Sequence, residues 1–230
     1  LDGIDDGDLI VIAARPSMGK TSLIASIALE SIKKGHGVLI ESLEMPADKI
    51  MRRLLSVHSE EYLSDIKNGL VKNLQRFNDS IQFLDTKNLI IHDETYPTLY
   101  KLQARIRKTL RKNPKIKNIF IDHTGKIQLE GKTREDIEIG HITNTLKKIA
   151  REYGIRVFLL QQLNRGVESR ENKRPTLSDI KNSGNVEEDA DIVLGLYRHS
   201  YYKAKESNGF ENDLEDAEII VLKNRDGALG

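Results

Sequence analysis

The chain has 230 residues, and its 36 Lys and Arg side chains nearly balance its 35 Asp and Glu side chains, for a net charge of +1. This length predicts one domain, or at most two small ones. No apolar run approaches the roughly 18–20 residues that cross a bilayer, which excludes a membrane protein. The sequence has no cysteine, which excludes a disulfide framework and a thiolate zinc site, so we expect a reducing, cytoplasmic setting.

Short apolar runs alternate along the chain with segments whose apolar residues recur every three or four positions. The first pattern predicts buried strands and the second predicts amphipathic helices. We expect strands over Asp8–Ala14, Val38–Leu43, Leu89–His92, Asn118–Asp122, Ile155–Gln161, Ala190–Tyr197 and Glu218–Lys223, and helices over Ser22–Ile32, from Pro46, over Thr98–Lys112 and through Ile142–Tyr153. This alternation predicts an α/β fold with a mostly parallel central sheet, covered by helices on both faces and formed as a single domain over residues 1–230.

Two stretches, 123–136 and 163–189, lack a periodic apolar pattern. The second is too long for an ordinary connector, and loops of that length are usually functional or disordered. Neither stretch contains Phe, Tyr or Trp, so stacking on nucleic acid bases is not expected there. Cations and backbone N–H groups could instead contact phosphates without reading the sequence, although a partner-binding or disordered segment is an equal alternative.

The clearest motif, Ala14-Arg15-Pro16-Ser17-Met18-Gly19-Lys20-Thr21, lies between the first expected strand and the first expected helix. A Walker A phosphate loop requires this strand–loop–helix context. Free N–H groups at the helix start would point at an anion, Lys20 would reach the β- and γ-phosphates, and Thr21 would offer its hydroxyl to Mg²⁺. Ala14 departs from the general pattern, which has Gly, and an ordinary strand-to-helix turn is the alternative.

Three polar residues follow other expected strands. Asp122 is a candidate Walker B ligand of Mg²⁺, because carboxylates at the carboxyl ends of parallel strands face the ligand crevice; the alternative is a cap. Glu44 could deprotonate the attacking water, or only complement the dipole of the next helix. Gln162 could sense the γ-phosphate, for which its position alone is weak support.

From the residues alone, we interpret two basic segments as exposed charged surface without a specific function. Lys101–Lys117 has eight Lys or Arg and no acid, and we interpret it as the solvated face of a helix rather than a nucleic-acid surface. Lys223-Asn224-Arg225-Asp226-Gly227 is typical of a strand that ends in an exposed charged turn, from which both cations would project outward. The six histidines are scattered and predict no zinc site; packing is the expected role of His123.

Longer segments extend these motifs: ARPSMGKTSL (14–23), SLEMP (42–46), QQLNRGVESRENKRPTLSDIKNSGNVEEDADIVLGLYR (161–198) and EIIVLKNRDG (218–227). Together they closely resemble the C-terminal motor domain of DnaB-type replicative helicases, in which Ala at position 14 is usual. The resemblance implies a RecA-like P-loop fold that hydrolyses ATP with Mg²⁺. It also implies a homo-hexamer that moves 5′ to 3′ on single-stranded DNA and works with primase and a helicase loader.

The resemblance also assigns roles to individual residues. Ser17, Met18, Gly19, Lys20, Thr21 and Ser22 would bind the nucleotide, with Thr21 and Asp122 at the metal, Glu44 as the catalytic glutamate and Gln162 as the link from γ-phosphate to the DNA loops. Arg225 would be the arginine finger and Lys223 its companion, both acting on the neighbouring subunit's nucleotide. Lys181, Asn182 and Gly184 would touch the DNA backbone.

The chain departs from the family in part. After Asp122 it continues His123-Thr124-Gly125-Lys126 where the family has Tyr-Leu-Gln, which affects the expected first DNA loop. The family's N-terminal collar domain and linker helix are missing, and the start at Leu1, without a signal peptide, leads us to expect a fragment. The alternatives are a RecA/RadA-type recombination ATPase, a non-hydrolysing scaffold that binds nucleotide only for assembly, and, as an outsider, a P-loop small-molecule kinase.

Overall fold

The computed structural model describes residues 3–86, 88–128, 135–180, 183–202 and 217–229, without the side chains of 135–138 and 183. The strands are β1 (Leu9–Ala14), β2 (Gly37–Ser42), β3 (Leu89–His92), β4 (Ile116–Asp122), β5 (Arg156–Gln162), β6 (Ile192–Arg198) and β7 (Ala217–Asn224). The helices are α1 (Lys20–Lys33), α2 (Ala47–Ser59), α3 (Leu63–Asn68), α4 (Leu74–Leu84), α5 (Leu99–Lys112), α6 (Glu135–Tyr153) and α7 (Ser183–Asp189). Three short 3₁₀ turns are η1 (Thr124–Lys126), η2 (Arg165–Ser169) and η3 (Leu177–Asp179).

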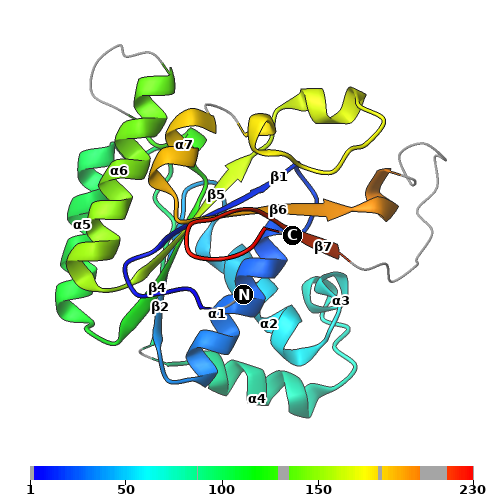
Figure 1. Ribbon diagram of the computed structural model, residues 1–230. Coiled ribbons are helices and arrows are strands. Elements are labelled where there is room, and N and C mark those ends of the chain that lie inside the picture. The colour runs from blue at the N-terminus through cyan, green and yellow to red at the C-terminus, as the bar shows by residue number, and fades with distance from the viewer. Residues whose placement is uncertain (1–2, 87, 129–134, 181–182, 203–216, 230) are drawn as a thin grey trace.

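The seven strands form one sheet in the order β3-β2-β4-β5-β1-β6-β7 (Figure 1). All neighbouring pairs are parallel except β6 and β7, which are antiparallel. The predicted mostly parallel sheet is therefore confirmed, and each strand lies within two residues of its predicted bounds. Strands β1 to β6 all end at the same side of the sheet, which we call its carboxyl end. Strand β7 runs the other way, so its last residue, Asn224, pairs with Ile192 at the amino end.

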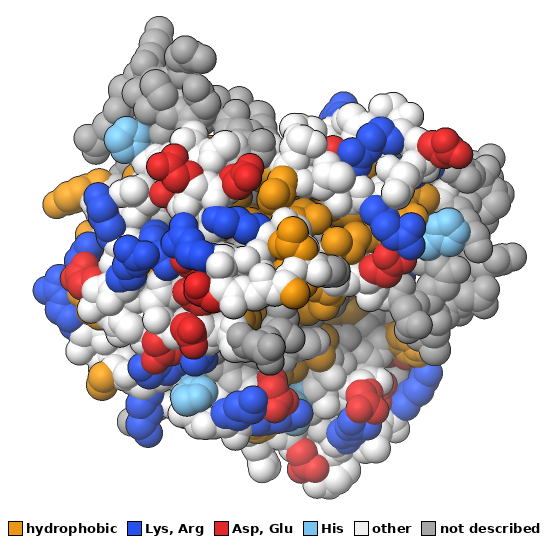
Figure 2. Space-filling view, in the orientation of Figure 1, with side chains coloured by type: hydrophobic (Ala, Val, Ile, Leu, Met, Phe, Trp, Pro, Cys, Tyr) orange, Lys and Arg blue, Asp and Glu red, His pale blue; other side chains and the backbone are white. Residues whose placement is uncertain are grey.

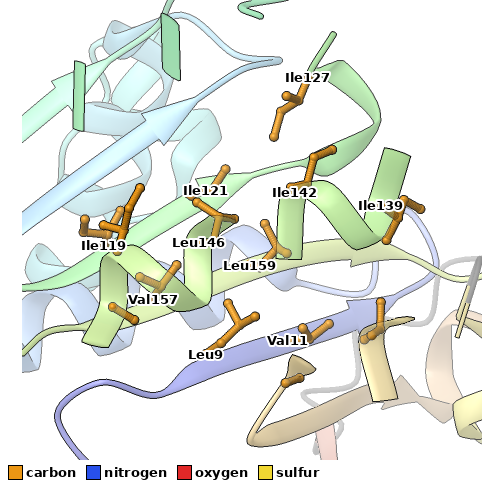
Figure 3. Close-up of a cluster of buried hydrophobic side chains, with 14 of the residues drawn as sticks. Leu9, Val11, Ile119, Ile121, Ile127, Ile139, Ile142, Leu146, Val157 and Leu159 are labelled. Atoms are coloured by element: carbon orange, nitrogen blue, oxygen red, sulfur yellow. The ribbon is translucent and has the colours of Figure 1, made fainter. Parts of the chain in front are cut away.

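Helices cover both faces of this sheet, as predicted. Along β1, Leu9, Val11 and Ala13 belong to one buried cluster, whereas Ile10, Ile12 and Ala14 belong to the other. Helices α5 and α6 pack on the first face, and Figure 3 shows the α6 side chains meeting those of β1, β4 and β5. Helices α1 and α2 pack on the second face. Burial on both faces explains why the strands are continuously apolar rather than alternating.

The region between α2 and β3 was not predicted. Pro46 is not the first helical residue but the N-cap of α2, with an extended ψ of 150°. Helix α3 has only six residues, too few for a periodic pattern. The sequence contains a weak signal for the start of α4, because Asn is a favoured N-cap residue. In the structure the Asn73 side chain caps α4 by accepting a hydrogen bond from the N–H of Arg76. Its apolar residues at 74, 77, 81 and 84 have helical spacing, yet Leu74 and Ile81 remain exposed.

The basic segment 101–117 lies on α5 and the start of β4, and acidic side chains pair with it. Arg105 binds the fully buried carboxylate of Glu41, with 2.6 Å between Nη2 and Oε2. Arg107 pairs with Glu152, and Lys117 pairs with Asp6. The opposite side of α5 is apolar and packs on the sheet. The partly exposed Arg107 and Lys117 pairs fit the interpretation of a solvated helix face, whereas Arg105 is largely buried.

The described part of the long loop after β5 is ordered. Its two ends meet at an antiparallel bridge between Leu163 and Ile180. Asp179 accepts hydrogen bonds from the backbone N–H of Thr176 and from Arg170 Nη2, 2.8 Å away. Of the open alternatives, a disordered segment does not match these contacts of residues 163–180. Among the described residues, no helix is long and apolar enough to span a membrane.

Candidate nucleotide-binding site

The loop between β1 and α1 has the backbone geometry of an anion cradle. Gly19 caps α1 with φ 94°, and Ser17 has φ 66°. A Cβ on Gly19 would meet nothing within 4 Å, so the dihedral angle, not a lack of space, favours glycine here. The first turn of α1 has no acidic side chain. The positive end of the helix and its unpaired N–H groups are therefore available to an anion.

The predicted loop residues divide by exposure. Ser17 and Ser22 are exposed, whereas the Met18 side chain is buried and packs in the core on the α1 face. Met18 can therefore offer a ligand only its backbone. Its side chain fixes the loop on the sheet.

Lys20 lies at the carboxyl ends of two neighbouring strands. Its Nζ donates to the carbonyl oxygens of Gln161 at 3.0 Å and Ala14 at 3.4 Å. Burial lowers the pKa of Lys20, and the charges of Asp122 and Glu44 oppose that shift. The three predicted charged residues are thus brought together at this end of the sheet. A phosphate would give the partly desolvated ammonium a further anionic partner.

Asp122 ends β4 and is 9% exposed. Burial raises the pKa of this carboxyl group, while Lys20 and His123 lower it. Thr21 and Asp122 line the same small cavity, together with Arg53 of α2. The Thr21 hydroxyl and the Asp122 carboxylate are hard oxygen donors of the kind that Mg²⁺ prefers. Burial of the Asp122 carboxylate outweighs the effect of the neighbouring cations on its pKa, so a bound cation would stabilise its charge. No group of three His, Cys, Asp or Glu that could hold a metal occurs among the described residues, so such an ion would keep water and phosphate ligands.

Glu44 lies two residues beyond β2 and is exposed. His123 Nε2 is 3.4 Å from Glu44 Oε2. The other ring nitrogen, Nδ1, accepts the N–H of Gly125 at 3.1 Å, so the proton of a neutral ring is on Nε2 and faces Glu44. Burial lowers the pKa of His123, which favours the neutral ring. Packing was the role predicted for His123; the structure places it in contact with the predicted catalytic carboxylate.

The two glutamines at the end of β5 lie on opposite faces. Gln162 is exposed and pairs in register with Ala14, on the α1 face. Gln161 is buried on the other face, where its Oε1 accepts a 2.8 Å bond from Thr124 Oγ1. Both line a cavity of about 370 Å³ with His123, between the segments that follow β4 and β5. Gln162 therefore lies between the phosphate loop and these segments.

Arg15 is a residue of the phosphate loop for which no role was predicted. Its guanidinium is buried, with Nε 2.9 Å from Glu168 Oε1 and Nη1 2.8 Å from the carbonyl oxygen of Leu163. Arg15 thus ties the phosphate loop to the loop after β5. The signal was a cation inside the motif, but its partner lies 153 residues away and could not be identified from local spacing.

Lys223 and Arg225 lie at the amino end of the sheet. Lys223 Nζ donates to the carbonyl oxygens of Glu187 and Ala190. Arg225 Nη1 is 2.9 Å from Asp191 Oδ1, and Nη2 donates to the carbonyl oxygen of Glu188 at 3.0 Å. Both cations therefore turn back onto the end of α7 within the chain, instead of projecting outward as predicted. The carbonyl groups at a helix C-terminus are negative and unpaired, which attracts them.

The predicted DNA-contacting residues are described only in part. Lys181 and Asn182 lie outside the described residues. Gly184 is exposed on α7.

Comparisons with known proteins agree on one family. The family model of the DnaB-like helicase C terminal domain matches residues 1–230. The replicative DNA helicase DnaB of Helicobacter pylori (strain ATCC 700392 / 26695) is 36% identical over 260 residues, which cover 99% of this chain and 53% of that protein. DnaB of Pasteurella multocida (strain Pm70) is 35% identical over 234 residues, with 99% and 49% covered. The chain thus spans about half the length of the curated relatives it matches.

Solved structures give the same result. One solved ATPase domain superposes with a TM-score of 0.89 at 32% identity, covering 99% of this chain and 81% of that one. A DnaB-like replicative helicase, whose structure was described with its interactions with primase, has a TM-score of 0.87 at 31% identity, covering 98% and 54%. The sheet order and these matches establish the predicted RecA-like α/β fold.

Proposed function

The chain belongs to the DnaB-like helicase C-terminal domain family, and from this premise we propose that it is the ATP-hydrolysing motor of a replicative DNA helicase. Residues 1–230 form one motor domain in this proposal. It binds ATP with Mg²⁺ and uses hydrolysis to move on single-stranded DNA and unwind the duplex.

The observation that carries the proposal is that two cations of the predicted site, Lys20 and Arg225, lie at opposite ends of the sheet. Lys20 binds the Ala14 carbonyl at the carboxyl end of β1. The Arg225 N–H binds Asp191, whose own N–H binds Leu9 at the amino end of β1. Five steps of about 3.3 Å separate Leu9 from Ala14, or about 16 Å. Arg225 is therefore too far to complete its own chain's site, and we infer that it acts on the nucleotide of a neighbour.

A site completed by a neighbour requires repeated head-to-tail contacts, and such contacts close into a ring when the rotation allows. We therefore propose a homo-hexamer, as the family resemblance implies. Figure 2 shows hydrophobic side chains gathered near the middle of the face that carries β6 and β7, with charged side chains around them. Ile219 of β7 is 46% exposed. An exposed apolar patch with a charged rim fits a subunit contact.

The geometry of the site supports the following chemical roles. The N–H groups at the start of α1 and Lys20 hold the phosphates, and Thr21 and Asp122 hold Mg²⁺, which would neutralise charge on the β- and γ-phosphates. Glu44 orients and deprotonates the attacking water, and the N–H of His123 supports its carboxylate. Gln162 senses the γ-phosphate. Arg225, with Lys223, stabilises the transition state in the adjacent subunit.

The partners are proposed from the family. Lys181, Asn182 and Gly184 would contact the backbone of single-stranded DNA, and movement would be 5′ to 3′. A solved relative is described with its interactions with primase, and we propose primase and a helicase loader as partners in a cytoplasmic replication complex. A RecA/RadA-type recombination ATPase is not favoured, because the family match spans residues 1–230.

Mixing two inactive variants of the full-length protein tests the split site. Lys20→Ala keeps the finger but loses the phosphate site, and Arg225→Ala does the reverse. We expect no DNA-stimulated ATPase from Lys20→Ala alone and only about a thousandth of the wild-type rate from Arg225→Ala alone. In randomly mixed rings about one interface in four combines two intact halves, so activity should return in part. Failure of well-assembled mixed rings to recover any activity would contradict catalysis across subunits.

A further inference from the structure

Two helices lead from the loops at the carboxyl end of the sheet toward Arg225. Helix α6 follows the segment after β4, and α7 follows the loop after β5. Ile180 lies beside Leu163 at the carboxyl end, whereas Asp191, just beyond α7, binds Leu9 at the amino end. Helix α7 thus covers most of the distance from the expected DNA-contacting end of the sheet to the end that holds Arg225.

The two helices touch along this path. A Cβ on Gly140 of α6 would lie only 3.1 Å from the side chain of Asn185 on α7, so glycine permits a close approach. Near the other end of α7, Thr143 Oγ1 donates to the carboxylate of Asp189. A displacement of α7 along its axis would therefore also displace α6, because the two helices are in close contact.

Asp191 joins both helices to the finger. It is 5% exposed. Its Oδ2 accepts the N–H of Leu9 at 2.8 Å and the ammonium of Lys147 on α6. Its Oδ1 accepts Arg225 Nη1 at 2.9 Å. One carboxylate oxygen is thus held by the scaffold, and the other is directed at the guanidinium.

The backbone and the end of α7 hold the same cations. The Arg225 N–H donates to the Asp191 carbonyl oxygen at 2.9 Å. Arg225 Nη2 and Lys223 Nζ donate to carbonyl oxygens of residues 187, 188 and 190. The Arg225 side chain is 42% exposed, and a half-exposed ion pair is weak enough to yield to a phosphate.

We propose that Asp191 is a positioning residue that holds the half-exposed Arg225 guanidinium where it can reach the neighbouring subunit's nucleotide, and that α7, through its contacts with α6, passes changes at the carboxyl end of the sheet to Asp191. This inference rests on the proposed function, in which Arg225 completes the neighbour's site. It adds a route by which DNA contact on one subunit changes ATP hydrolysis at its interface with the next.

The test compares Asp191→Asn with Asp226→Asn in the full-length protein. Asp226 is exposed and follows Arg225 directly, so the control removes the same charge but leaves the bonds of Arg225 to Asp191 and Glu188 in place. We expect Asp191→Asn to lower the DNA-stimulated kcat about tenfold, since a mis-aimed finger loses part of its roughly 10³–10⁵ effect. The KM for ATP should stay within about twofold, because the phosphate site itself is unchanged. Asp226→Asn should resemble the wild type.

A merely structural role for Asp191 makes different predictions. Asp191→Asn added to Arg225→Ala should cause no further loss if Asp191 acts through Arg225, and Asp191→Glu should recover part of the activity. A folded hexameric Asp191→Asn protein with wild-type kcat would overturn the inference, as would an additive loss in the double variant. Wild-type protein that shows no Lys20-dependent ATPase would instead refute the proposed function.

A second variant keeps the inference testable if Asp191→Asn does not fold. Thr143→Val preserves side-chain shape but removes the hydroxyl contact between α6 and Asp189. We expect its stimulation by single-stranded DNA to fall severalfold while the rate without DNA is retained. Unchanged stimulation would overturn the role of α7 in transmission.

Discussion

The two ends of the sheet hold their functional cations in opposite ways. At the carboxyl end, Lys20 is partly desolvated beside the buried Asp122, and burial shifts the pKa values of both groups against their charged forms. At the amino end, Arg225 is half exposed and shares ordinary hydrogen bonds with Asp191 and α7. In the proposed function, the buried Lys20 would bind phosphate, whereas the hydrogen bonds that hold Arg225 could be exchanged for a phosphate. This difference would suit the proposed motor, which would bind nucleotide firmly and yet change its subunit interfaces in every cycle.

The largest expected effect contrasts substitutions at the two ends. Lys20→Ala should abolish turnover and weaken ATP binding, because the cation that meets the phosphates is lost. Arg225→Ala should lower kcat about 10³-fold or more and leave nucleotide affinity unchanged. Steady-state ATPase assays and equilibrium titration with a fluorescent ATP analogue would measure both, with Lys33→Ala on exposed α1 surface as the control. An equal loss of ATP affinity in both variants would contradict the proposed difference between the two ends of the sheet.

Glu44→Gln should separate binding from chemistry within the carboxyl end. The amide keeps the shape of the side chain but cannot accept the proton of the attacking water, so turnover should fall by about 10²–10⁴. Affinity for ATP should stay near that of the wild type. Normal turnover in a single-turnover assay would remove Glu44 from the general-base role.

Asp122→Asn should impair the proposed metal site but stabilise the nucleotide-free protein against unfolding. Because burial raises the pKa of this carboxyl group, its charge opposes folding above the ordinary Asp pKa. The nucleotide-free variant should therefore be more stable at neutral pH by about 1 kcal/mol, or about 2–4 °C in Tm. The gain should shrink as the pH falls toward the ordinary range of the carboxyl group, where both states are protonated. Thermal unfolding from pH 7 to pH 4 would measure it, and a lower Tm at pH 7 would contradict the buried-charge interpretation.

The last contrast concerns the loop backbone. Gly19 and Gly35 both have positive φ, and a Cβ at either position meets nothing within 4 Å. Each Gly→Ala change should cost about 1–2 kcal/mol from backbone strain alone. Only Gly19→Ala should also weaken ATP binding, since it alone lies in the phosphate loop. Comparable binding losses in both variants would show that strain, not the cradle, sets the affinity.

Much of the fold was predictable because its signals are local. Continuous apolar runs marked all seven strands, and the spacing Leu102, Ile106 and Leu110 marked the buried side of α5. The phosphate loop was recognisable because one short segment supplies its N–H groups, its lysine and its threonine. Helices α3 and α4 were not predicted, because α3 has only six residues and α4 leaves apolar residues exposed.

The sequence by itself determined the strands, the phosphate loop and, through resemblance, the candidate residues Glu44, Asp122 and Arg225. Only the tertiary structure decided how they are arranged. The antiparallel course of β7 places Arg225 at the end of the sheet opposite Lys20. The packing of α5 on the sheet pairs Arg105 with the buried Glu41. The contact of His123 with Glu44 joins the segments that follow β4 and β2. These relations depend on strand order, direction and burial, which arise from contacts between residues far apart in the chain and leave no periodic trace in it.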